Sequence, residues 1–220
     1  MKPKIDYSLY LVTDRELMSS KSIEESVERA ILGGCTVVQL REKDISTRDF
    51  FELGLRVKKI TDKHRVPLII NDRVDIAKAI GAAGVHVGQD DMPAKLARAI
   101  IGKKKILGVS ASKLDEALTA VSDGADYLGV GAVFSSATKP DANVTGLLEL
   151  KRISENVKIP IVAIGGINEE TIPIMQQAGV KIDGAAIVSA IVSAADPTEA
   201  SKKMKNMVRG ILKNEKSLPL

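Results

Sequence analysis

Short apolar runs, each followed by a stretch of helical periodicity, recur eight times along the chain and constrain its fold more than any other feature. The runs are apolar on consecutive residues, as in parallel strands that are covered on both faces. We predict strands at Ser8–Thr13, Thr36–Leu40, Pro67–Ile70, Gly84–Val87, Lys105–Val109, Asp126–Val130, Pro160–Ile164 and Ile182–Ile187. The predicted helices are Ile23–Leu32, Thr47–His64, Asp75–Ile80, Ala94–Ile101, Leu114–Ser122, Gly146–Glu155, Glu169–Gln177 and a last amphipathic helix around Met204–Leu212.

Eight such units in 220 residues leave about 27 residues for each, which is compact but sufficient for a closed barrel. The sequence therefore predicts an α/β protein with a single (β/α)8 barrel of the TIM type and parallel strands. An open doubly wound sheet usually has fewer strands and, for dinucleotides, a glycine fingerprint after the first. Here Asp14-Arg15-Glu16 follows the first run. No linker divides the chain, so residues 1–220 are predicted to form one domain.

Glycines mark the ends of the predicted helices, because the residue after a helix often adopts a left-handed conformation. Glycines that fit this position are Gly33, Gly34, Gly84, Gly102, Gly124 and Gly179.

The composition excludes several classes of site and partner. A single cysteine, Cys35, rules out an internal disulfide and a thiolate-rich zinc site, and two histidines, His64 and His86, rule out a histidine-rich metal centre. Aromatic residues make up 3% of the chain, too few for a base-stacking surface. The longest nearly uncharged run, Gly184–Ala195, is too short to span a bilayer. We expect a cytoplasmic protein without nucleic-acid or membrane partners.

The excess positive charge lies near the C-terminus. From Asp196 onward, six basic residues face three acidic ones, which accounts for +3 of the net charge of +4. A basic amphipathic helix could bind nucleic acid or a membrane surface, but a solvated outer face is the interpretation we favour.

Functional residues of such a barrel lie at the carboxyl ends of its strands, and these ends carry an unusual set of polar groups. The segments concerned are Gln39–Asp44, Asn71–Arg73, Gly88–Asp91, Ser110, Phe134–Lys139, Gly165–Gly166 and Val188–Ser189. Cations, hydroxyls and glycines alternate there with a few carboxylates. Such a set suits an anionic substrate together with a hard cation.

Asp72 and Asp91 follow successive strands, so their carboxylates can converge. Two carboxylates without histidine or cysteine favour Mg²⁺, which completes its coordination with water and phosphate oxygens. Each aspartate could instead cap the helix that follows it, because aspartate is favoured at helix starts. Both interpretations stay open at this point.

Two phosphate sites are indicated, one with metal and one without. Arg41, Lys43 and Lys139 can neutralise phosphate, although Arg41, Glu42 and Lys43 could also form an exposed ion-pair cluster. Hydroxyls, paired glycines and a helix start can bind a second phosphate. These groups are Ser136, Thr138, Gly165, Gly166, Val188 and Ser189. We expect His86 to have a structural role and Cys35 to be a small buried apolar residue.

In their order and spacing these segments resemble the thiamine phosphate synthase family, whose barrel enzymes join the pyrimidine and thiazole halves of thiamine. The resemblance extends from Tyr10 to Ile191 and covers most of the chain. Its most specific parts are Gln39–Lys43, Asn71–Arg73, His86–Asp91, Thr138–Lys139 and Ala163–Ile167.

The resemblance implies a role for each site residue. Asp72 and Asp91 would bind Mg²⁺ on the diphosphate. The pyrimidine diphosphate would be held by Gln39, Leu40, Arg41, Glu42, Lys43, Asn71, Ser110 and Lys139, and the thiazole phosphate by Ser136, Ala137, Thr138, Gly166, Val188 and Ser189. One segment departs from the family, which usually has Phe-Pro-Thr where this chain has Phe134-Ser135-Ser136. The hydroxyl is kept, but the methyl group and the rigid proline are lost.

The implied reaction needs no protein nucleophile. The pyrimidinylmethyl diphosphate ionises, and the thiazole nitrogen captures the carbocation to give thiamine phosphate and diphosphate. The catalytic groups would be Arg41, Lys43 and Lys139, which with Mg²⁺ stabilise the departing charge.

Two other enzyme classes stay open. A thiazole tautomerase-like paralogue performs a proton transfer and has no need for the full diphosphate-binding set. Another phosphate-binding barrel enzyme, such as an isomerase or epimerase, would need a general base at the rim. The substrates are small molecules in each case, and the sequence leaves a homo-oligomer open.

Overall fold

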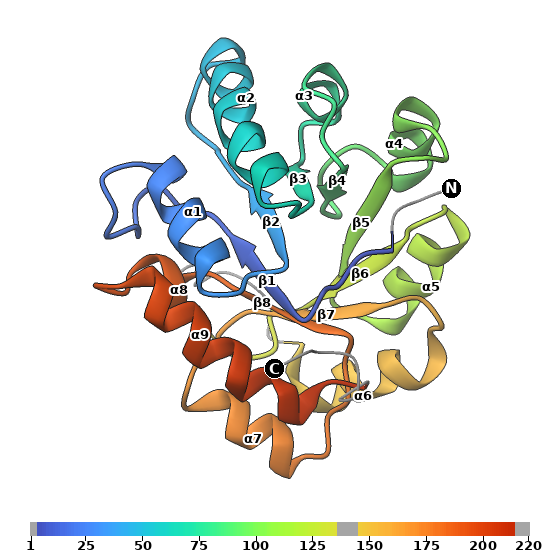
Figure 1. Cartoon of the computed structure of the whole chain (residues 1–220). Coiled ribbons are helices and arrows are strands. Elements are labelled where there is room, and N and C mark those ends of the chain that lie inside the picture. The colour runs from blue at the N-terminus through green and yellow to red at the C-terminus, as the bar shows by residue number, and fades with distance from the viewer. Residues whose placement is uncertain (1–3, 136–144, 214–220) are drawn as a thin grey trace.

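The computed structural model describes residues 4–135 and 145–213 and has a closed barrel of eight parallel strands (Figure 1). Each strand pairs with the next in sequence order, and the last pairs with the first. The strands are β1 (Leu9–Val12), β2 (Val37–Leu40), β3 (Leu68–Asn71), β4 (Gly84–Val87), β5 (Ile106–Ala111), β6 (Tyr127–Val130), β7 (Ile161–Ile164) and β8 (Gly184–Ile187). The predicted (β/α)8 fold is confirmed.

Helices surround the barrel in Figure 1 and connect its strands. They are α1 (Ile23–Leu32), α2 (Thr47–Lys63), α3 (Val74–Ala79), α4 (Ala94–Ile101), α5 (Leu114–Ser122), α6 (Gly146–Asn156), α7 (Thr171–Gln177), α8 (Ser189–Val192), α9 (Pro197–Val208) and the 3₁₀ turn η1 (Arg209–Ile211). Side-chain caps begin several of them: Ser22 accepts from the Glu25 N–H, and Asp196 precedes a proline at the first turn of α9. Among the helices of residues 4–135 and 145–213, none is long and apolar enough to cross a membrane.

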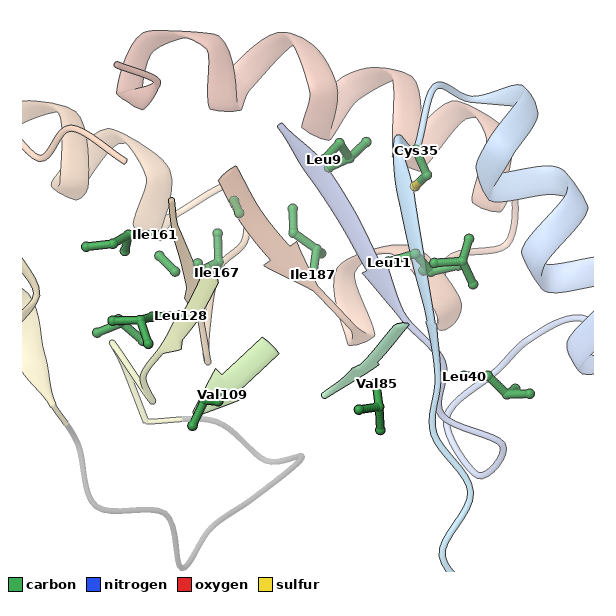
Figure 2. Close-up of a cluster of buried hydrophobic side chains, with 14 of the residues drawn as sticks. Leu9, Leu11, Cys35, Leu40, Val85, Val109, Leu128, Ile161, Ile167 and Ile187 are labelled. Carbon is green, nitrogen blue, oxygen red and sulfur yellow. The ribbon is translucent and has the colours of Figure 1, made fainter. Parts of the chain in front are cut away.

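Alternating strand residues build two apolar layers. In β1, Leu9 and Leu11 pack in the larger cluster between strands and helices, part of which Figure 2 shows, whereas Tyr10 and Val12 belong to the cluster inside the barrel. Cys35 lies in the outer cluster and is 3% exposed, which confirms it as a buried apolar residue. All three tyrosines of the chain belong to the inner cluster. The tyrosine rings therefore lie inside the barrel, whereas Phe50 packs in the outer cluster.

One of the predicted glycine assignments is wrong. Gly102, Gly124 and Gly179 have positive φ and follow helices as expected, but Gly84 is the first residue of β4. A Cβ atom at Gly84 would lie 2.2 Å from the Ile106 carbonyl oxygen, so the glycine is needed for close contact between β4 and β5. Gly81, with φ +69°, ends the preceding helix instead.

The basic face of α9 is largely paired within the fold. Lys202 contacts Glu199 at 2.7 Å, and Lys203 contacts Glu169 at 2.5 Å. Beyond the helix, Lys213 lies 3.2 Å from Asp183. These exposed ion pairs support the interpretation of a solvated helix face.

Replacement of Arg65 by glycine should stabilise the fold. Arg65 follows α2 with φ +57°, a left-handed conformation that costs a non-glycine residue on the order of 1 kcal/mol. Glycine removes this cost, but its unfolded chain is more flexible and loses more entropy on folding. We therefore expect Arg65→Gly to raise the free energy of unfolding by about 0.5 kcal/mol. Lys59→Gly, at an exposed helical position in α2, is the control and should lower it by roughly 1 kcal/mol. Denaturant unfolding measures both, and a destabilised Arg65→Gly variant would contradict the prediction.

Candidate active site

A cavity of about 410 Å³ opens at the carboxyl ends of the strands, where the sequence places function. All eight strands or the loops that follow them contribute to its lining. The cavity brings together eight predicted site residues: Gln39, Arg41, Asn71, Ser110, Gly165, Gly166, Val188 and Ser189.

Other predicted residues lie beside the cavity rather than in its wall. The Leu40 side chain is fully buried between the barrel and the helices, so only its backbone could contact a substrate. The Glu42 carboxylate accepts two hydrogen bonds from Arg15, at 3.0 and 3.2 Å, and its side chain is 3% exposed. Ser136, Ala137, Thr138 and Lys139 lie outside the described residues.

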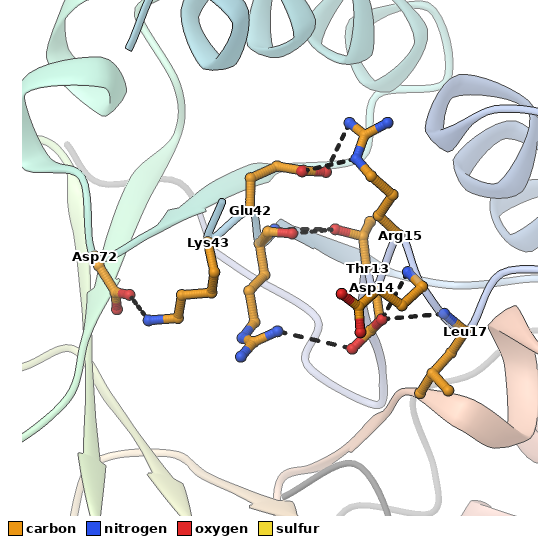
Figure 3. Close-up of polar contacts among 9 residues, drawn as sticks. Thr13, Asp14, Arg15, Leu17, Glu42, Lys43 and Asp72 are labelled. Carbon is orange, nitrogen blue, oxygen red and sulfur yellow. Dashed lines mark hydrogen bonds and ion pairs between the residues drawn. The ribbon is translucent and has the colours of Figure 1, made fainter. Parts of the chain in front are cut away.

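Lys43, Asp72 and Asp91 form a cluster at the rim, on the loops after β2, β3 and β4. The Lys43 ammonium donates to Asp72 Oδ2 at 2.5 Å (Figure 3). The two carboxyl groups lie within hydrogen-bonding distance of each other, and Asp91 Oδ2 also accepts the Gly88 N–H at 2.8 Å. The carboxylates converge as predicted.

Neither aspartate caps a helix. The residues at the cap positions of α3 and α4 are Arg73 and Pro93, and neither cap has a side-chain hydrogen bond. Asp72 instead has φ +60°, in the left-handed region, which aspartate adopts more readily than most other non-glycine residues. The structure therefore contradicts the capping interpretation.

The rim carboxylates suit a divalent cation. Burial raises the pKa of Asp72, the Asp91 carboxyl raises it further, and Lys43 opposes both effects. Burial also disfavours the charged form of Asp91, but hydrogen bonds from Asp72 and Gly88 hold its pKa below the usual range. No group of three or more histidine, cysteine or acidic residues in the described chain could hold a metal. Mg²⁺ fits, because one or two carboxylates with water and phosphate oxygens complete its shell.

A chain of buried hydrogen bonds crosses the base of the cavity. Gln39 Nε2 donates to the Tyr10 hydroxyl at 2.9 Å, and the Tyr10 and Tyr127 hydroxyls lie 2.7 Å apart. Tyr127 lies 2.9 Å from His86 Nδ1, and His86 Nε2 lies 2.9 Å from Ser110 Oγ. The structural role expected for His86 is confirmed. Burial raises the pKa of both tyrosines and keeps them neutral.

Two strand glycines make room for this chain. A Cβ atom at Gly108 would lie 2.2 Å from Tyr127 Cζ and 2.4 Å from His86 Nδ1, and one at Gly129 would lie 2.9 Å from His86 Cε1. The two large rings therefore occupy space that the neighbouring strands leave free.

The loop after β1 holds the loop after β2 in place (Figure 3). Thr13 Oγ1 accepts the Arg41 N–H at 2.9 Å, and the Asp14 carboxylate lies 3.7 Å from the Arg41 guanidinium. Arg41, Glu42 and Lys43 thus pair with Asp14, Arg15 and Asp72 respectively. They do not form the mutual ion-pair cluster that the sequence left open.

The glycine pair after β7 brings two loops together. Gly166 has φ +65°, and a Cβ atom there would lie 2.7 Å from Phe134 Cβ and 2.9 Å from the Ser135 carbonyl oxygen. Gly166, Val188 and Ser189 line the same cavity, opposite to the polar groups of β3 and β4 in the order of the barrel.

Comparison with known proteins identifies the family of this chain. The family model described as thiamine monophosphate synthase matches residues 9–191. The chain belongs to this family. It is a transferase of thiamine biosynthesis, similar to the thiamine-phosphate synthase of Clostridium beijerinckii at 61% identity over 94% of this chain and 98% of the relative. The Clostridium botulinum enzyme of the same name is 58% identical over 93% of this chain and 95% of the relative.

A solved structure agrees as well. The thiamine phosphate pyrophosphorylase of Pyrococcus furiosus superposes with a TM-score of 0.85 at 40% identity, covering 94% of this chain and 97% of that one. The resemblance to the family that the sequence motifs indicated is thus confirmed over nearly the whole chain.

Several residues of the site are not predicted from the sequence. Tyr10, Thr13, Asp14, Tyr127 and Asn168 all line the cavity. Tyr10 and Tyr127 lie within apolar runs, and this pattern indicates core residues. The one available signal was that tyrosine hydroxyls, when buried, require a hydrogen-bond partner.

Removal of the Tyr127 hydroxyl should destabilise the protein. In Tyr127→Phe, the Tyr10 hydroxyl keeps its hydrogen bond from Gln39, but it and His86 Nδ1 each lose the one to Tyr127, and removal of one partner from buried hydrogen bonds costs about 1–3 kcal/mol. Tyr7→Phe is the matched control, because the Tyr7 ring packs against Tyr127 at 4.8 Å and its hydroxyl takes no part in this chain of hydrogen bonds. Its effect should stay within about 0.5 kcal/mol. Denaturant unfolding compares the two, and equal losses would show that the chain adds no stability.

Proposed function

We propose that this member of the family joins 4-amino-2-methyl-5-(diphosphooxymethyl)pyrimidine to a thiazole phosphate, releasing diphosphate. One observation carries the proposal: a cavity lined by Arg41 and several other polar side chains lies next to the converging carboxylates of Asp72 and Asp91. This combination suits a substrate that carries a diphosphate and a second that carries a phosphate.

The cations of the rim would stabilise the leaving group. Arg41 reaches the cavity, and Lys43 lies on the adjoining loop; Lys139, outside the described residues, would join them. Mg²⁺ held by Asp72 and Asp91 would supply further positive charge to the departing diphosphate. Lys43 contacts Asp72 in this structure, and its flexible side chain could equally contact a diphosphate oxygen.

The base of the cavity would bind the pyrimidine ring. Gln39, Asn71 and Ser110 present amide and hydroxyl groups there, and the hydrogen bonds to Tyr10 and His86 fix Gln39 and Ser110 in place. An aminopyrimidine offers both donors and acceptors, which such groups can match. A fixed ring orientation would align the breaking C–O bond with the incoming thiazole nitrogen.

The thiazole phosphate would bind across the cavity. Gly166, Val188 and Ser189 lie there, and the family resemblance adds Ser136, Ala137 and Thr138. Ser136 keeps the hydroxyl of the family's threonine, so we expect its hydrogen bond to the phosphate to be retained.

Two observations favour this function over the alternatives. Both ring nitrogens of His86 lie within hydrogen-bonding distance of protein hydroxyls, which does not suit the general base of an isomerase or epimerase. The Lys43–Asp72–Asp91 cluster exceeds what a thiazole tautomerase needs. The partners would be small molecules rather than nucleic acid or membrane, in the cytoplasm.

A coupling assay tests the proposal. The protein is incubated with both phosphorylated halves and Mg²⁺, and thiamine phosphate is detected by mass. Formation of thiamine phosphate with release of diphosphate is expected, whereas conversion of the thiazole alone would indicate a tautomerase.

Turnover should require a divalent cation. Excess chelator should abolish it and added Mg²⁺ should restore it, because Asp72 and Asp91 cannot bind a diphosphate without one. Asp72→Asn should reduce kcat by about a hundredfold and leave the fold intact, since asparagine also tolerates positive φ. Asp75→Asn, at an exposed ion pair with Arg73, is the control and should behave like the parent. Full activity in chelator would remove the metal from the mechanism.

Loss of the Ser189 hydroxyl should affect one substrate selectively. Ser189→Ala removes a donor from the proposed thiazole phosphate site, so we expect its KM for the thiazole phosphate to rise about five- to tenfold with little change in the pyrimidine KM. Ser136→Ala should act in the same way. Ser193→Ala, an exposed serine at the end of α8, serves as control. Steady-state kinetics decide, and equal changes in both KM values would mean that the two sites are wrongly divided.

A further inference from the structure

Asp14 has no role in the function proposed so far, yet its position is unusual. It is the one carboxylate among the described residues that line the cavity. It follows β1, which pairs with β2 on one side and β8 on the other. Arg41 follows β2, and Val188 and Ser189 follow β8. Asp14 therefore lies between the proposed diphosphate and thiazole phosphate sites, where the two substrates would meet.

The carboxylate of Asp14 is fixed by its own loop. Its Oδ1 accepts the backbone N–H groups of Glu16 and Leu17 at 3.1 and 3.2 Å, and its side chain is 13% exposed. The distance of 3.7 Å from Oδ2 to the Arg41 guanidinium is too long for a hydrogen bond. Arg41 could thus turn toward another anion without loosening Asp14.

The loop itself is anchored on both sides. Arg15 binds Glu42 beyond β2. On the other side the Ser19 N–H donates to the Val192 carbonyl of α8 at 2.8 Å. The carboxylate is therefore held in a constant place relative to both proposed phosphate sites.

A fixed carboxylate in this cavity disfavours both substrates, because each carries a phosphate group. The reaction, however, creates positive charge between them. When the C–O bond breaks, both electrons leave with the diphosphate oxygen and the methylene carbon becomes cationic. The lone pair of the thiazole nitrogen then forms the C–N bond and the charge moves to the thiazolium ring; no proton is transferred. A carboxylate there stabilises the transition state more than the bound substrates.

We propose that Asp14 is a catalytic residue whose carboxylate is the counter-ion of the cation formed between the two substrates. This inference rests on the proposed function. A role in positioning Arg41 is the competing explanation, and it predicts the opposite effect on anion binding. Loss of a positioning group weakens diphosphate binding, whereas loss of a counter-ion removes repulsion and leaves that binding unchanged or tighter.

Asp14→Asn separates the two explanations, because the asparagine oxygen still accepts the Glu16 and Leu17 N–H groups. Glu16→Gln, an exposed residue of the same loop, is the control for loss of one negative charge. Single-turnover rates are measured with both substrates and Mg²⁺, and the affinity for inorganic diphosphate with Mg²⁺ by calorimetry. For Asp14→Asn we expect a rate lower by about a hundredfold and diphosphate affinity at least equal to the parent. A rate within about threefold of the parent, or a diphosphate affinity that falls as much as the rate, would overturn the proposal.

A binding experiment on the unmodified protein tests the same idea. Thiamine phosphate is compared with an analogue in which a neutral thiophene replaces the thiazolium ring. We expect the cationic ligand to bind about five- to tenfold tighter, and Asp14→Asn to lose this preference. Equal affinities in the parent overturn the role of Asp14 even where the variant does not fold. A parent that forms no thiamine phosphate overturns the proposed function itself, whereas an active parent and an equally active Asp14→Asn variant overturn only this inference.

Discussion

The interior of an eight-stranded barrel is just wide enough for side chains to fill it, and the way this chain fills it determines the site above. Aliphatic residues alone would give a dry core. Here Tyr10, Tyr127 and His86 occupy the interior, and Gly108 and Gly129 leave the space they need. Buried hydroxyls and ring nitrogens require hydrogen-bond partners. The three side chains therefore form one chain of hydrogen bonds that ends at Gln39 and Ser110 in the cavity. The same interactions that complete the core therefore orient polar groups of the site.

Closure of the barrel adds a second constraint. Pairing of β8 with β1 brings the loops after β8, β1 and β2 together, although they are far apart in sequence. The loop after β1 contacts both neighbours, through Arg15 and Glu42 on one side and Ser19 and Val192 on the other. Arg41 lines the cavity and pairs with Asp14 of the loop after β1, whereas Lys43 pairs with Asp72 of the loop after β3. Two cations of one short segment, Arg41 and Lys43, thus lie in different parts of the site, the cavity and the rim.

Much of this could be read from the sequence, because burial on both faces imposes consecutive apolar runs and a barrel places function at strand ends. The converging Asp72 and Asp91 follow from those two facts. Side-chain direction does not: Leu40 faces the helices and Glu42 binds Arg15, although both lie in the most specific motif. Exclusion of the helix-cap interpretation for Asp72 needed the backbone conformation and the helix start, which one sequence does not reveal. Gly84 was misassigned because close strand packing and helix ends favour the same residue.

Charge balance connects the parts of the site. The proposed substrates bring phosphate groups only, so carboxylates near them require a physical reason. At the rim, a divalent cation bound by Asp72 and Asp91 would turn their repulsion of the diphosphate into attraction. Asp14 instead lines the cavity, where two backbone N–H groups of its own loop fix its carboxylate and the Arg41 guanidinium lies 3.7 Å away, beyond hydrogen-bonding distance. A carboxylate that is costly for bound anions is favourable once positive charge forms beside it. The rim would favour departure of the diphosphate, and the cavity would favour the cation left behind.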